Sequence, residues 1–248
     1  MSTIYILWLR QLKRYWRSKP RVVGSLGQPI LFLIAFGFGM GPMFAKAGGG
    51  NYIDFLAPGV MAQAILFMAT FSGIELIWDR QFGFLKETLV APVSRLEIVI
   101  GRILGGATIA TLQGIIVFLL TLLVGFRPVN IVWLPVAVGV MFLTSLLYTS
   151  LGTAIASTLK DFHGFQLIMN FLVMPSFFLS GALFPLQNSP NILRTISKIN
   201  PLTYGVDALR EIMVGTTHLG LMADVLVLGA VTAFLLMVSS FLFSKIEV

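Results

Sequence analysis

Six long apolar stretches restrict the fold of this chain more than any other feature of its sequence. They lie at residues 22–44, 55–77, 98–126, 132–159, 165–183 and 221–243. A helix needs about 20 apolar residues to cross the hydrocarbon layer of a membrane. Every backbone amide must also be bonded within the protein there, which a helix achieves by itself. The sequence therefore predicts an all-α integral membrane protein with six transmembrane helices.

Charged residues are too few to cover a surface that faces water. They make up 11% of the 248 residues, and hydrophobic residues make up 57%, whereas a globular protein has roughly 25% charged residues. A soluble enzyme and a disordered chain are thereby excluded. The absence of cysteine removes thiolate metal ligands and thiol nucleophiles. We expect one transmembrane domain over residues 1–248, with no metal site and no cofactor of its own.

Most of the basic residues lie on one side of the predicted spans. Six crossings bring both termini to that side, which carries Arg10, Lys13, Arg14, Arg17, Lys19, Arg21, Arg80, Lys86, Arg95, Arg102, Lys160 and Lys245. Cytoplasmic loops carry an excess of Lys and Arg, so both termini are predicted to be cytoplasmic in a multi-pass protein of the cell membrane. Because these residues flank apolar runs, we assign their partner as membrane lipid and not nucleic acid.

Residues 3–18 have the pattern of an amphipathic helix. Apolar side chains such as Ile4, Leu7 and Trp8 recur at helical spacing, while Arg10 and Arg14 project elsewhere. Such a helix lies in the headgroup plane, with its cations on anionic lipid. The alternative is an ordinary positively charged flank of the first span.

The cytoplasmic connection at residues 79–92 is long and apolar for a simple loop. Phe82, Leu85 and Leu89 share one face of a short helix that Pro92 would end. A Ser-x-x-Glu capping box at 94–97 then starts the third span. An apolar face in water predicts a partner protein, and folding back onto the bilayer is the alternative.

The external segment at residues 184–218 contains two helix start signals. Ser189 precedes Pro190 and Asn200 precedes Pro201, and each pair combines an N-cap with a proline at the first helical position. They predict short helices at about 190–198 and 201–215, which would lie at the outer leaflet or re-enter it as a gate. A plain surface loop is the alternative.

Ionisable residues lie at the cytoplasmic edges of the second and third spans. Glu75 and Asp79 end the second span, and Arg102 lies about one turn into the third. A charge at the edge of a bilayer can pair or reach the interface. We predict a network of Glu75, Asp79 and Arg102 that joins the two spans, and not a proton relay, since no acidic residue lies near a midplane.

Three blocks of sequence carry a resemblance to a known family. They are ELIWDRQFGFLKETLVAPVSR at 75–95, LSGALFP at 179–185 and NPLTYGVDALR at 200–210. In this order they resemble the membrane subunit of type-2 ATP-binding-cassette (ABC) transporters, of the daunorubicin-resistance and polysaccharide exporter type. The resemblance covers essentially the whole chain.

The resemblance implies roles for particular residues. The first block corresponds to the coupling helix that docks on the ATPase subunit, which implies contacts by Arg80, Phe82, Phe84, Leu85, Glu87 and Leu89. The other two blocks frame the external re-entrant helices, which implies a gate at Pro185, Pro190, Asn200, Pro201 and Tyr204. If spans two and five face the pathway as in that family, the lining residues are Gln63, Phe67, Phe71, Asn170, Phe177 and Phe178. Taken singly, the polar residues among them are better explained by hydrogen bonds between helices.

The resemblance implies the permease of an ATP-driven exporter, related to multidrug resistance, that moves an amphipathic, lipid-like or drug-like cargo by alternating access. The chain has no Gly-Lys pair and hence no P-loop, so ATP and Mg²⁺ are expected on an ATPase partner. A second permease copy, identical or not, would complete a dimer. An autonomous carrier or channel would need midplane carboxylates or inverted repeats. A serine hydrolase at Ser180 would need His163 or His218, which fall in loops on opposite sides.

Overall fold

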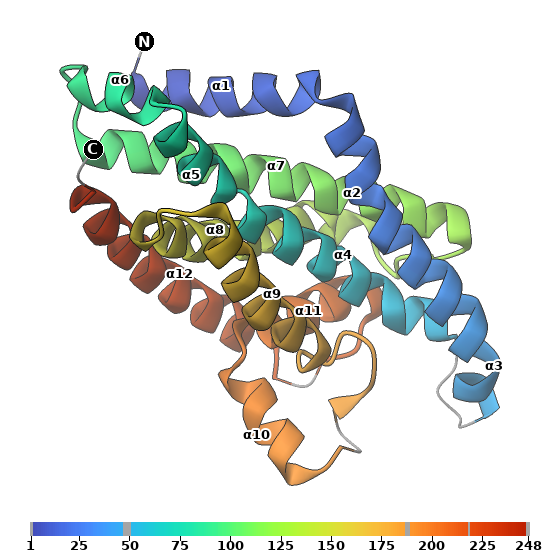
Figure 1. Ribbon diagram of the computed structural model, residues 1–248. Coiled ribbons are helices and arrows are strands. Elements are labelled where there is room, and N and C mark those ends of the chain that lie inside the picture. The colour runs from blue at the N-terminus through green and yellow to red at the C-terminus, as the bar shows by residue number, and fades with distance from the viewer. Residues whose placement is uncertain (1, 47–50, 187–188, 218, 247–248) are drawn as a thin grey trace.

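The computed structural model describes residues 2–46, 51–186, 189–217 and 219–246, and within these ranges all regular secondary structure is helical (Figure 1). The expected all-α class is therefore correct. The elements in chain order are α1 Thr3–Arg17, α2 Lys19–Phe32, the π-helix η1 Leu33–Phe38, α3 Gly39–Lys46, α4 Tyr52–Phe71, α5 Ile74–Gln81, α6 Phe84–Val90, α7 Arg95–Val124, the short η2 Ile131–Trp133, α8 Leu134–Thr158, α9 Phe162–Phe178, α10 Asn191–Ile199, α11 Pro201–Val214 and α12 Leu221–Ser244.

Five helical segments in the described ranges are long and apolar enough to cross a membrane. They are Lys19–Phe44, Tyr52–Gln81, Arg95–Val124, Ile131–Thr158 and Leu221–Ser244. The remaining predicted span, 165–183, is represented by α9, which has 17 residues where a crossing needs about 20. The chain leaves the helix at Leu179 and turns at Gly181, whose φ is 76°. Six spans are therefore not confirmed, and the multi-pass class is.

Local sequence explains where several helices begin. The Ser94 hydroxyl accepts the Glu97 N–H and the Glu97 carboxylate accepts the Ser94 N–H, which is the predicted capping box at the start of α7. Asn200 caps α11 with its side chain, also as predicted. The predicted cap at Ser189 is wrong. Pro190 itself holds the N-cap position of α10 with an extended backbone, so no side chain caps that helix.

The central helix of the bundle is α4, most of whose residues are buried. Glycine allows its backbone to touch two neighbours. A Cβ at Gly59 would lie 2.4 Å from the carbonyl oxygen of Ala182, just after α9. A Cβ at Gly152 of α8 would lie 2.2 Å from the carbonyl oxygen of Thr70 in α4. Small residues at these contacts let the helices approach closely, so α4 is held between α8 and the turn after α9.

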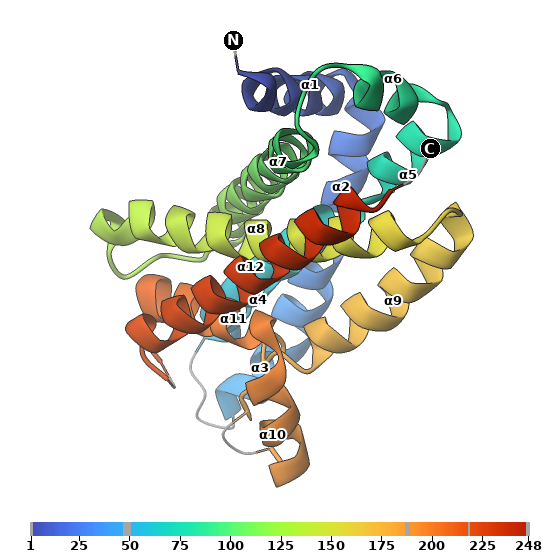
Figure 2. The same ribbon diagram turned by 90° about the vertical axis from the view of Figure 1, so that its left-hand side faces the viewer.

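The bundle has two opposite ends, which Figures 1 and 2 show. Helices α1 and α6 lie at one end, and α10 projects at the opposite end. The last described residues return to the first of these ends, because Arg95 at the start of α7 donates hydrogen bonds to the carbonyls of Ser244 and Ile246. We call the two ends the α6 end and the α10 end.

Helix α1 packs on protein with the side chains that its pattern assigned to lipid. Leu7 and Tyr15 are buried, and the indole N–H of Trp8 donates a 3.0 Å hydrogen bond to the Thr108 hydroxyl of α7. The tight fit requires glycine in α7, since a Cβ at Gly105 would lie 2.7 Å from α1. The helix at 3–17 is present, but α7 covers part of its apolar stripe, while Trp16 remains 59% exposed.

Candidate functional site

The corner between α5 and α6 exposes apolar side chains at the α6 end. Gly83 makes the corner with a φ of 81°, a backbone conformation that favours glycine. Phe82 and Phe84 are 71% and 51% exposed, and Val90 at the end of α6 is 85% exposed. Leu85 is fully buried. The predicted face of Phe82, Leu85 and Leu89 is therefore wrong as an exposed face: the corner turns Phe82 outward, whereas Leu85 packs into the protein.

The remaining side chains predicted to contact a partner surround this corner. Glu87 is exposed and Leu89 is half-buried against the same core as Leu85. Arg80 donates a 3.2 Å hydrogen bond to the carbonyl of Leu159, which ties the α8–α9 connection to the end of α5. The exposed corner therefore carries both charged and apolar side chains.

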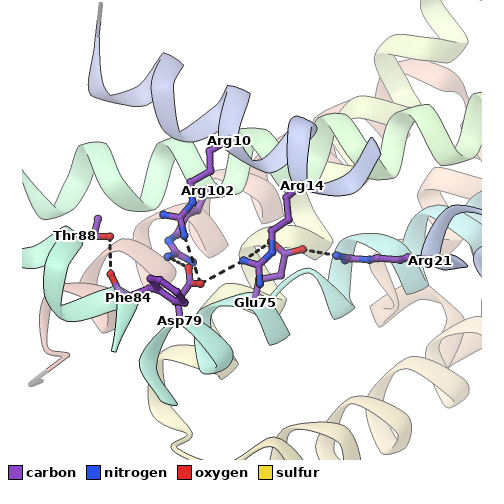
Figure 3. A network of polar contacts seen from close by, with 8 residues as sticks. All are labelled: Arg10, Arg14, Arg21, Glu75, Asp79, Phe84, Thr88 and Arg102. Atoms are coloured by element: carbon purple, nitrogen blue, oxygen red, sulfur yellow. Dashed lines mark hydrogen bonds and ion pairs between the residues drawn. The ribbon is translucent and has the colours of Figure 1, made fainter. Parts of the chain in front are cut away.

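A cluster of ion pairs fixes the base of α5, as Figure 3 shows. Asp79 pairs with Arg102 of α7, with Arg14 at 3.3 Å and with Arg10 at 3.6 Å. Both carboxylate and guanidinium of the Asp79–Arg102 pair are almost fully buried. Burying a charge is costly unless it is paired and hydrogen-bonded, so this pair depends on both partners.

Glu75 belongs to the same cluster through other partners. Its carboxylate lies 2.5 Å from Arg21 of α2 and 4.0 Å from Arg14 of α1. The predicted contact of Asp79 with Arg102 is therefore present, whereas Glu75 pairs with the N-terminal helices. Sequence reasoning missed the three arginines at 10, 14 and 21. The spacing of four residues places Arg10 and Arg14 on one side of α1, whereas Arg21 belongs to α2.

A cavity of about 360 Å³ lies between α2 and α4. Gln63, Phe67 and Phe71 line it from α4, and Gln28 lies on the α2 side. Gln63 is 1% exposed, and neither atom of its amide has a hydrogen-bond partner. Buried polar groups usually have a hydrogen-bond partner, so this amide is an exception. These three predicted pathway residues therefore lie together.

The other three predicted pathway residues, all from α9, do not line this cavity. Phe177 is fully buried and packs edge-on against Phe32 of α2, with ring centroids 5.5 Å apart. Asn170 and Phe178 are exposed on the surface of α9. The structure thus separates the predicted set into a cavity group and an α9 group.

At the α10 end, some of the predicted gate residues make hydrogen bonds that join α9, α10 and α11. The amide nitrogen of Asn200 donates a 2.6 Å hydrogen bond to the carbonyl of Ser176, which ties α11 to α9. The Tyr204 hydroxyl donates to the carbonyl of Lys198 and closes the corner between α10 and α11. Pro201 begins α11 and Pro185 precedes α10. Residues 187, 188 and His218 of the segment at 184–218 lie outside the described residues.

Arg210 of α11 is a charged residue at this end that is almost fully buried, with 4% of its surface exposed. It donates hydrogen bonds to the carbonyls of Phe55 and Gly181, and its guanidinium carbon lies 4.0 Å above the Phe55 ring. Burial lowers the pKa of Arg210 to about 10, and the nearby Asp207 counteracts this. Arg210 is therefore still charged at neutral pH.

The long apolar helices define a multi-pass membrane protein. The chain belongs to the ABC-2 type transporter family, whose sequence profile matches residues 2–214. It is thus a transport subunit and not an enzyme, and the family implies an ATPase partner. The Ser180 hydroxyl donates to the carbonyl of Phe177, and the exposed His163 lies at the far end of α9, while His218 lies outside the described residues.

Several curated relatives are similar over most of the chain. Nodulation protein J of Rhizobium leguminosarum bv. trifolii is 31% identical over 78% of this chain and 74% of its own length. Nodulation protein J of Rhizobium meliloti (strain 1021) is 30% identical, over 87% of this chain and 83% of its own. A protein named putative transport permease ycf38 from Porphyra purpurea is 28% identical, over 84% of this chain and 72% of its own.

Proposed function

We propose that this chain is the permease of an ATP-driven ABC exporter in the cell membrane, with its α6 end and both termini in the cytoplasm. The observation that carries the proposal is the exposed apolar corner formed by Phe82, Phe84 and Val90. Apolar side chains clustered in water favour a protein contact. The basic residues of α1 at the same end support a cytoplasmic orientation. ATP and Mg²⁺ would bind to the separate ATPase subunit that docks on this corner.

The connection from the corner to the cavity supports coupled motion. Leu85 anchors the corner in the core, and Asp79 and Glu75 fix the base of α5 to α1, α2 and α7. Helix α5 continues α4 after a short break at residues 72 and 73, and α4 supplies one wall of the cavity. A push on the corner would therefore shift α4 against α2. ATP binding drives transport only by favouring one of these arrangements, which is alternating access.

The cargo that suits the cavity is amphipathic, lipid-like or drug-like. Phe67 and Phe71 offer apolar surface, and the unpaired amide of Gln63 offers a donor and an acceptor. On this proposal α9 is the sixth crossing, and α10 with α11 is the external gate. A second permease copy, identical or not, would cover the exposed side of α9, where Leu167 and Phe171 are 71% and 85% exposed.

The test compares two exposed valines, one in the chain before α7 and one in the chain after it. Val90 lies at the corner, and Val129 lies in the loop after α7 and is 73% exposed. The ATPase is first identified by mass spectrometry after pull-down with the wild-type chain, and is then co-expressed with each variant. We expect Val90→Asp and Phe82→Asp to lose most of the ATPase from the purified complex, because a charge replaces an apolar contact.

The Val129→Asp control should retain the ATPase at the wild-type level. Leu85→Asp is unsuitable as a probe, because a charge at this fully buried position would disrupt the fold. All variants must reach the membrane in equal amount. ATPase recovery that is equal for Val90→Asp, Phe82→Asp and wild type would refute the docking assignment.

A further inference from the structure

A second cavity, of about 440 Å³, lies at the α10 end, on the opposite side of the bundle from the corner between α5 and α6. Its walls come from α10, α11 and the turn after α9. Three cations line it: Arg194 and Lys198 of α10, and Arg210 of α11. Asp207 is the one acidic residue among the described lining residues, and it already accepts a 3.0 Å hydrogen bond from the N–H of Leu219. The cavity therefore carries a net positive charge.

Two buried polar groups in this cavity lack a partner. Arg210 uses its Nη2 for two backbone carbonyls, but its Nε has no hydrogen-bond acceptor. Thr203 is 8% exposed, and its hydroxyl has no partner either. Buried donors of this kind are almost always bonded in a folded protein. A guest that supplies several acceptor oxygens would satisfy both groups.

Helix α10 places this cavity at the level of lipid headgroups. Ile192, Ile196 and Ile199 are 73%, 40% and 77% exposed, on the side of the helix away from the cavity. Arg194 and Lys198 lie on the cavity side. A short helix with one apolar and one cationic side lies in the membrane interface, with its apolar side in the acyl region. Figure 2 shows α10 projecting from the bundle.

We infer that this cavity binds the phosphate group of an anionic lipid or lipid-like molecule in the outer leaflet. Phosphate presents several oxygens around one centre, which matches guanidinium, ammonium and hydroxyl donors that converge from two helices. A carboxylate has only two oxygens and would satisfy fewer of them. The outer-leaflet position rests on the orientation in the proposed function, whereas the binding itself does not depend on the ATPase.

Binding is measured on the purified full chain in a neutral maltoside detergent by microscale thermophoresis. The probes are dioctanoyl phosphatidic acid, dioctanoylglycerol with the same chains and no phosphate, and inorganic phosphate. We expect phosphatidic acid to bind at least about tenfold more tightly than dioctanoylglycerol, with an affinity that falls as salt is added. Competition by inorganic phosphate at equal concentration would identify free phosphate, and not lipid, as the source of the group.

The variants test the cations without disturbing the fold. Arg194 and Lys198 are exposed, so the double variant Arg194→Gln with Lys198→Gln should fold normally. We expect it to bind phosphatidic acid about tenfold more weakly than the wild type. Thr203→Val removes the unpartnered hydroxyl at nearly constant shape and should weaken the binding of phosphatidic acid about threefold. The matched control Lys46→Gln changes an exposed lysine outside the cavity and should leave the affinity unchanged.

Two results would overturn the inference: equal binding of phosphatidic acid and dioctanoylglycerol, or an affinity of the double variant within twofold of wild type. Neither result concerns the ATPase. Conversely, retention of the ATPase by Val90→Asp and Phe82→Asp would refute the docking assignment and leave this site intact, so the two proposals fail separately.

Discussion

The Asp79–Arg102 pair gives the sharpest prediction about stability. Asp79→Asn keeps the shape of the side chain and removes its charge, which leaves the Arg102 guanidinium buried without its anion. That guanidinium is 6% exposed. Removal of one partner from a buried ion pair costs about 3–5 kcal/mol, because the remaining charge is neither solvated nor neutralised.

The other ion pairs of Asp79 contribute less. Arg10 and Arg14 are 42% and 39% exposed, and exposed pairs are worth about 0–1 kcal/mol each. They remain close to Arg102 after the substitution, however, and their repulsion is then no longer offset. We therefore expect Asp79→Asn to lower the free energy of unfolding by at least about 3 kcal/mol, whereas Arg10→Gln should lower it by less than about 1 kcal/mol.

The assay is thermal unfolding of the purified protein in detergent micelles. At about 2–4 °C per kcal/mol for a chain of this size, Asp79→Asn should lower Tm by about 6–12 °C. Glu87→Gln is the matched control, since it makes the same chemical change at an exposed position, and it should shift the free energy by less than about 0.5 kcal/mol.

A double-mutant cycle checks the cause. Arg102→Met removes the stranded charge, so the double variant Asp79→Asn with Arg102→Met should be more stable than Asp79→Asn alone. The coupling between the two positions should exceed about 1 kcal/mol. The reasoning is refuted if Asp79→Asn costs no more than Glu87→Gln, or if the two single effects simply add.

Two further predictions concern packing and pH. Gly59→Ala should destabilise the protein by about 1–3 kcal/mol, because the new Cβ would lie 2.4 Å from a backbone oxygen. Gly139→Ala has nothing within 4 Å of its new Cβ and should stabilise the protein by up to about 1 kcal/mol. Equal Tm values for the two variants would contradict this prediction. Burial raises the pKa of Tyr15 above its usual 10.0, so Tyr15 contributes stability that is present below pH 10 and is lost as pH rises through its higher folded-state pKa. Tyr15→Phe should lower the free energy of unfolding by about 1 kcal/mol at neutral pH. The substitution removes the 3.0 Å hydrogen bond from the Tyr15 hydroxyl to Gln113, which still accepts a hydrogen bond from Ser25. The difference in Tm between Tyr15→Phe and wild type should narrow in alkaline buffer, and a constant difference would count against the pKa shift.

The features that local sequence can encode were predictable. Apolar runs specified helices because backbone bonding and side-chain transfer act residue by residue. The capping box at Ser94 and the cap at Asn200 were also readable, since a cap bonds within about three residues. The acidic residue at 79 and its partner at 102 could be paired because they lie at the edges of adjacent spans.

Other features depended on contacts between distant segments. The exposed face of α6 is set by the turn at Gly83, which buries Leu85 and exposes Phe82, and a helical repeat cannot tell which face a corner turns outward. A Gly-x-x-x-Gly pattern is too common in a chain with 24 glycines to reveal that α1 packs on α7.

The sequence by itself determined that the chain is helical and spans a membrane, because composition and local spacing fix these properties, whereas the ATPase partner is what the family implies. Only the tertiary structure decided which arginines neutralise Glu75 and Asp79. It also placed Gln63 beside a cavity, with no hydrogen-bond partner for its amide, and buried Arg210 beside Phe55. The physical reason is that burial and pairing are properties of two or more segments in contact, and the order of residues along one segment does not contain them.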